Sequence, residues 1–208
     1  MRRRTPEEVQ AGFEALVATA KSVFALAGAG NLKACPELAT SMQGDIGKLG
    51  MGAVMGSRNG PALIQAVDFV QRSLNQNDPA AVQVHANRVV LQASRTLYHN
   101  GKSIQSAADS MDSTGYEVSH LTEKAADSEW KSLVVEVPEY WTAVRPKLNM
   151  DKGVVNKTDE LVAALAKAGS LVEARRLAEG LYDKTHAVLQ TLTPGLAGTD
   201  RSSDKADR

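Results

Sequence analysis

The sequence has little of several features that define common classes of protein. It contains one cysteine, Cys35, in 208 residues. A lone cysteine excludes an intrachain disulfide and a zinc site built from several cysteines. It also fits a reducing compartment, so we expect a cytoplasmic protein. Aromatic residues make up only 4% of the chain, a scarcity that suits a helical bundle in which small side chains let helices approach closely. No run of about 18 apolar residues occurs, so we expect no transmembrane span.

The chain also lacks an excess of charge, with 24 basic and 24 acidic residues. A general nucleic-acid coat would be more basic than this. The charge is nevertheless uneven: residues 72–105 are almost entirely basic among their charged positions, and residues 109–139 are almost entirely acidic. This split is favoured as two solvated faces of unequal sign, and it would also allow pairing between two copies arranged head to tail, or between one copy and another helix.

The strongest pattern present is a heptad repeat in the middle of the chain. Such spacing predicts one long helix over 79–133 with a narrow apolar face for another helix. Asp78 and Pro79 supply its expected start. Asn100-Gly101 resembles a helix stop, but an inserted loop would usually shift the repeat, so a continuous helix is favoured and breaks near 100 or 113 stay open. The repeat consists of Val90, Leu97, Ile104, Met111, Val118 and Ala125.

Helical patterns also flank this segment. Thr5-Pro6-Glu7-Glu8 has the order of a capping box with proline in the first turn. We expect a single all-α domain over 1–197, a helical bundle around the long helix with a C-terminal helical hairpin. The expected parts are a helix over 5–29, a short helix plus Gly-rich connector over 36–60, a helix over 61–76, a short extended segment at 133–137, a loop over 146–157, a hairpin over 158–192 and a disordered tail over 198–208.

Two segments resemble nucleotide-binding loops but lack what the chemistry needs. Asn100-Gly101-Lys102-Ser103 looks like the end of a phosphate-binding loop, yet Thr96 stands where that loop has its first glycine. The glycines of 50–56 lack the β-strand that would present them to a pyrophosphate. The histidines are scattered, with no pair at the spacing of a zinc site. We therefore expect no catalytic residue, no cofactor and no metal, and a protein that is not an enzyme.

Two sets of residues are candidates for contacts with other molecules. Tryptophan and tyrosine are common anchors of protein interfaces, but Trp130, Tyr140 and Trp141 also suit the end of a bundle core, which is the favoured interpretation. Basic residues seven positions apart on a helix are placed to meet successive phosphates, although a solvated face is favoured for them. The candidate protein interface comprises Val90, Leu97, Ile104, Met111, Trp130, Tyr140 and Trp141. The candidate phosphate contacts are Arg2, Arg3, Arg4, Arg88, Arg95 and Lys102.

These observations favour a structural or assembly protein that acts through helix–helix contacts and self-association, as a component of a particle, a filament or a secretion apparatus. Its partner would be a second copy or another helical protein. The alternative is a helical protein that coats nucleic acid, which is possible but not favoured. A third hypothesis, from the glycines and apolar residues of 44–60, is a membrane-active helical protein.

Overall fold

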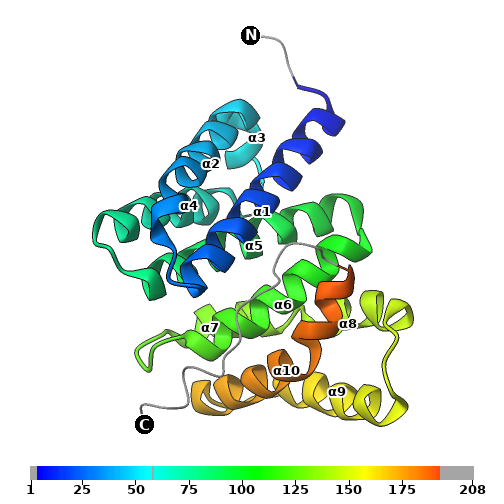
Figure 1. The fold of residues 1–208 in the computed structure, drawn as a ribbon. Helices are drawn as coiled ribbons and strands as arrows, with labels where there is room; N and C mark the ends of the chain where they lie inside the picture. Colours follow the sequence, from blue (N-terminus) through cyan, green and yellow to red (C-terminus); the bar gives the residue numbers. More distant parts are fainter. Residues whose placement is uncertain (1–3, 58, 193–208) are drawn as a thin grey trace.

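The computed structural model describes residues 4–57 and 59–192 and shows an all-α helical bundle, without a strand in those ranges. Figure 1 shows α5 and α6 between two groups of helices. The helices are α1 (Pro6–Gly28), α2 (Cys35–Leu49), α3 (Met51–Met55), α4 (Gly60–Asn75), α5 (Pro79–Gly101), α6 (Ile104–His120), α7 (Asp127–Val134), α8 (Val137–Val144), α9 (Lys152–Leu165) and α10 (Leu171–Leu192), with 3-10 turns at Leu32–Ala34 and Arg145–Lys147.

The apolar core consists of two clusters that meet at the centre. The first lies among α1 to α4 and one side of α5, and includes Phe13, Phe24 and Met42. The second lies among α6 to α10 and the other side of α5, and includes Trp130 and Tyr140. Because α5 contributes to both clusters, and α6 packs against α5, α8 and α10, these two helices join the halves of the bundle.

The predicted long helix is divided into α5, α6 and α7, which corrects the preference for a continuous helix. Lys102 adopts the left-handed conformation with φ of 52° and ends α5. Ser103 then caps α6, because its Oγ accepts the Ser106 N–H at 3.1 Å. The first break therefore falls just after Asn100-Gly101, near a position that the sequence left open. The α6 helix continues through 113, and a second break follows between His120 and Asp127, which the sequence did not indicate. The apolar repeat kept its phase although α5 and α6 pack side by side rather than end to end.

The N-terminal helix begins as its sequence predicts. Thr5 and Glu8 form the capping box: the Glu8 N–H donates to Thr5 Oγ1 at 3.2 Å, and the Thr5 N–H donates to Glu8 Oε2 at 2.8 Å. The C-terminal hairpin is also present, as α9 packed against α10. The α9 helix begins at Lys152, where Asp151 caps it, so much of the predicted loop at 146–157 is helical.

Two further segments differ from expectation. The predicted extended segment at 133–137 contains the end of α7 and the start of α8. The expected Gly-rich connector is mostly helical, because α2 runs through to Leu49 and α3 follows at once. Gly60 allows α3 and α4 to approach closely at the end of this segment. A Cβ atom at that position would lie 1.9 Å from the Val54 carbonyl oxygen, so only glycine fits there. The predicted tail at 198–208 lies outside the described residues.

Candidate functional site

Most of the candidate interface residues lie inside the bundle. Trp130 and Tyr140 are fully buried, and Val90, Met111 and Trp141 are nearly so. Leu97 and Ile104 are partly buried. Burial of the first five in the chain's own core removes them from any surface that another protein reaches in this conformation. The heptad repeat therefore arises from packing within one chain, because the apolar residues of α5 and α6 pack against other helices of the same bundle.

The basic stretch pairs with the acidic stretch of the same chain. Arg95 Nε donates to Glu136 Oε2 at 2.9 Å, and both side chains are buried. This intramolecular pairing accounts for the split of charge without a second copy or a nucleic acid. The other two pairs are Arg88 with Glu117 at 2.6 Å and Lys102 with Glu139 at 2.6 Å. Of the remaining phosphate candidates, Arg4 is exposed, while Arg2 and Arg3 lie outside the described residues.

Three carboxylates of α6 are buried, and each pairs with a basic side chain from a different helix. Asp109 accepts from Lys21 Nζ of α1. Asp112 lies 2.9 Å from His186 Nδ1 of α10, and Glu117 pairs with Arg88 of α5. Every residue from Ser106 to Val118 is buried. Because buried ion pairs require specific partners in specific positions, these three contacts fix how α6 is oriented among its neighbours.

The environments of these carboxyl groups shift their pKa values in different directions. Burial raises the pKa of Asp109 and of Glu117, despite the Lys21 ammonium beside the first and the Arg88 guanidinium beside the second. Burial also acts to raise the pKa of Glu136, but hydrogen bonds from Arg95 and Tyr140 outweigh it and lower that pKa. Burial, with the hydrogen bond to Glu139, raises the pKa of Tyr98 to about 12.

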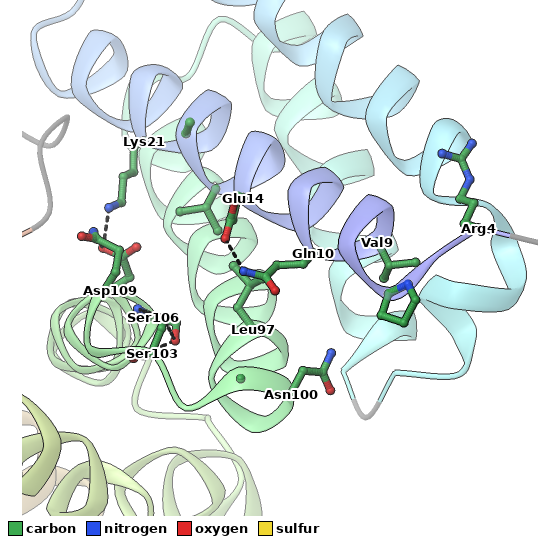
Figure 2. Close-up of a pocket in the computed structure, with 15 residues that line it drawn as sticks. Arg4, Val9, Gln10, Glu14, Lys21, Leu97, Asn100, Ser103, Ser106 and Asp109 are labelled. Atoms are coloured by element: carbon green, nitrogen blue, oxygen red, sulfur yellow. Dashed lines mark hydrogen bonds and ion pairs between the residues drawn. The ribbon is translucent and has the colours of Figure 1, made fainter.

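One of the ion pairs lies at one end of a large open cleft. An open cleft of about 920 Å³ lies between α1 and the junction of α5 with α6. Figure 2 shows Lys21 reaching from α1 toward Asp109, with Ser103 and Ser106 nearby. Apolar side chains line it beside the polar ones. The cleft residues are Arg4, Pro6, Val9, Gln10, Glu14, Val17, Ala18, Lys21, Leu97, Asn100, Gly101, Ser103, Gln105, Ser106 and Asp109.

The cleft is long because α1 forms one of its walls. Its lining runs from Pro6 to Lys21, which spans about 22 Å along a helix at 1.5 Å per residue. Val9, Val17 and Leu97 give an apolar base, whereas Gln10, Glu14 and Asn100 are polar. Figure 2 shows Gln10 and Glu14 on the turns of α1 beside Leu97 of α5. A groove of this form suits an elongated ligand better than a compact one.

Sequence reasoning identified two of the cleft residues, Arg4 and Leu97, and missed the ion pair. One signal was available for Lys21, because it stands four residues after Val17 and three before Phe24, on the apolar face of the first helix. A lysine on such a face needs a partner when it is buried. The sequence gave no means of choosing Asp109 from the many acids of 109–139.

A metal centre and a membrane-spanning helix are two other features that could mark a functional site. No group of three or more His, Cys, Asp and Glu side chains within residues 4–57 and 59–192 is placed to hold a metal ion. The α1 helix is long and apolar enough to cross a membrane by length and composition alone, although no uninterrupted apolar run had been found there. In this structure α1 packs against α2 and α5, as a core helix of a soluble protein also would.

Comparisons with protein-family models, with curated proteins and with solved structures give no match for this chain. Function is therefore inferred from the chemistry of the cleft and the surfaces around it.

Proposed function

We propose that this protein is a non-enzymatic assembly protein that binds an amphipathic helix of another protein in the cleft between α1 and the α5–α6 junction. The observation that carries the proposal is the form of the cleft, an elongated groove with an apolar base and polar sides. An amphipathic helix in such a groove buries its apolar face and leaves its polar face in water. A segment of about 15 residues has the length of the groove.

The groove also defines what the bound helix should look like. Val9, Val17 and Leu97 favour apolar partner residues spaced three and four apart, so that one stripe faces the base. Arg4, exposed at one end of the groove, favours an acidic residue near the corresponding end of the partner. Gln10 and Asn100 are placed to exchange hydrogen bonds with polar side chains flanking that stripe.

A helix of another protein is favoured over a second copy of this chain. The large apolar side chains that are exposed among the described residues are Met55, Val135, Val154 and Val172. They lie in separate parts of the bundle, so no described helix of this chain offers two of them in a stripe. Self-association, which the heptad repeat and the split charge first suggested, remains a prediction that a measurement of solution mass tests.

The other two hypotheses have less support. A nucleic-acid coat would need basic groups available to phosphates, whereas Arg88, Arg95 and Lys102 each pair with a carboxylate of this chain. A membrane-active segment at 44–60 would need several exposed apolar side chains, but Leu49 and Val54 are buried and Met55 is the one large apolar residue exposed in the described part of that segment. A cytoplasmic location remains part of the proposal.

The test uses a model peptide rather than an unidentified partner. A 15-residue amphipathic helix with leucine at positions three and four apart, and a scrambled peptide of the same composition, are titrated against the protein by calorimetry. We expect saturable binding of the amphipathic peptide alone. Ala18→Arg fills the groove from an exposed position on α1 and should abolish binding. Ala15→Arg, also exposed on α1 but outside the groove, is the matched control and should bind like the wild type.

The outcomes separate the occupants. Equal binding of both peptides, or equal loss in both arginine variants, overturns the groove as a helix site. A wild-type dimer that Ala18→Arg converts to a monomer, while Ala15→Arg does not, identifies the occupant as a second copy and overturns the choice of a different protein. Sedimentation equilibrium at low and at about 1 M salt measures this, because an apolar contact resists salt that screens charge pairs.

A further inference from the structure

A second pocket lies on the opposite side of α5 from the groove. It has a volume of about 310 Å³ and is lined by residues of α4, α5, α6 and α7 and by Asn59, which precedes α4. Two arginines of α5 line it, Arg88 and Arg95, together with the amide side chains of Asn59, Gln65 and Gln92. A pocket of this volume is at the small end of the range that holds small molecules. Its two arginines distinguish it from the groove, whose lining includes one arginine, Arg4.

Several of these donors have no acceptor in the part of the chain that the structure describes. Arg88 donates through Nε to Glu117, so both of its terminal nitrogens are without a hydrogen bond. Arg95 uses Nε for Glu136 and one terminal nitrogen for the Ser132 carbonyl, so its other terminal nitrogen is likewise without one. Asn59 Nδ2 is buried and also lacks a partner. A buried amide without an acceptor is costly, and a ligand with several acceptor oxygens would accept from Asn59 Nδ2 and from the free guanidinium nitrogens.

The charge around the pocket limits what that ligand can be. Each arginine is already paired with a carboxylate, and Glu129 adds another acidic group to the lining. A polyphosphate or an extended nucleic-acid backbone would meet these carboxylates. A small oxyanion with one or two charges needs only the free guanidinium edges and the amides, because planar guanidinium groups bind carboxylate and phosphate oxygens in pairs.

We propose that the pocket bounded by Arg88, Arg95, Asn59, Gln65 and Gln92 binds a small oxyanion, a phosphate or carboxylate group on a compact molecule. The proposal is independent of helix binding in the groove, since the two sites share no lining residue. Removing either arginine would take the guanidinium partner from a buried carboxylate and destabilise the protein strongly. The informative variants are therefore those at Gln65, an exposed residue of α4 that lines the pocket.

The experiment titrates inorganic phosphate and, separately, acetate at constant ionic strength, with binding followed by NMR shifts of the Gln92 side-chain amide and the arginine Nε–H groups. We expect saturable shifts in the wild type for one or both anions, and the arm that responds identifies phosphate or carboxylate as the ligand group. Gln65→Glu should weaken binding about tenfold and Gln65→Lys should strengthen it. Gln71→Glu and Gln71→Lys, on the same helix but outside the pocket, should bind like the wild type.

Two results would overturn the proposal. One is the absence of saturable shifts up to about 10 mM of either anion, ten times a millimolar dissociation constant. The other is an equal response to charge at Gln65 and at Gln71, which would show nonspecific attraction to the surface. Binding of a short single-stranded RNA that Gln65→Glu abolishes, without binding of either small anion, would also contradict a small-molecule site and would support the nucleic-acid hypothesis instead.

Discussion

The two central helices, α5 and α6, are buried by different means. Most of the buried positions of α5 hold apolar residues, such as Val89, Val90 and Leu91. In α6 every residue from Ser106 to Val118 is buried, although three of those side chains are carboxylates. Apolar burial is non-directional and tolerates many arrangements, whereas each buried carboxylate needs one specific partner. The comparison teaches that burial of apolar surface mainly stabilises the position of α5, whereas specific ion pairs mainly determine the position of α6.

The largest expected effect comes from breaking an ion pair of α6. Lys21→Met should lower the free energy of unfolding by about 3 to 5 kcal/mol, because Asp109 would remain buried without a counter-charge. The double variant Lys21→Met/Asp109→Leu should recover most of this loss, since an apolar pair needs no partner. Urea denaturation measures both. Lys157→Met is the matched control: its exposed pair with Glu160 should contribute less than about 1 kcal/mol.

An apolar deletion in α5 tests the other side of the comparison. Leu91→Ala should cost about 2 to 5 kcal/mol, because Leu91 is fully buried and its removal leaves a cavity. Leu97→Ala should cost less, because one side of Leu97 faces the groove. Denaturation of the two variants under the same conditions compares them. Equal costs would mean that the groove is closed in solution and that Leu97 is as buried as Leu91.

The turn between α5 and α6 gives a smaller effect whose sign is informative. Ser103→Ala should destabilise the protein by about 1 kcal/mol, because the cap of α6 is lost. In one continuous helix the same change would stabilise, since alanine is the better helix former. Ser41→Ala, at an exposed position within α2, is the control and should raise stability by a few tenths of a kcal/mol. Thermal unfolding of both variants decides between two helices and one.

The smallest effects are expected from pH, with opposite signs at two carboxyl groups. Glu117 has a raised pKa in the folded state, so it contributes stability that increases as the pH falls toward its ordinary value of 4.5. Glu136 has a lowered pKa, so it contributes stability that is present above 4.5 and is lost as the pH falls through its folded-state pKa. The stability of wild type relative to Glu117→Gln should therefore rise on acidification, and relative to Glu136→Gln it should fall. Melting temperatures across an acid series measure both differences, and slopes of equal sign would contradict these environments.

The sequence by itself predicted α1 and α4 with their ends and the start of α5. Local signals are sufficient there, because a capping box at Thr5 and Glu8, or a proline after Asp78, acts within one turn of the chain. It also determined that the fold is all-α, through apolar residues at helical spacing. The sequence did not predict where α5 ends and α6 begins. The heptad repeat stays in phase across the left-handed turn at Lys102, because a short turn between side-by-side helices can preserve that phase by coincidence.

Only the tertiary structure decided which residues face each other. The basic and acidic stretches were visible in the sequence, but the partners Arg95 and Glu136 are 41 positions apart, and Lys21 and Asp109 are 88 apart. The sequence shows that such charged residues are present. It does not show which of them form ion pairs, or whether those pairs form within one chain or between two. The groove and the arginine-lined pocket depend on the same long-range packing, since each is bordered by helices whose mutual positions no local pattern specifies.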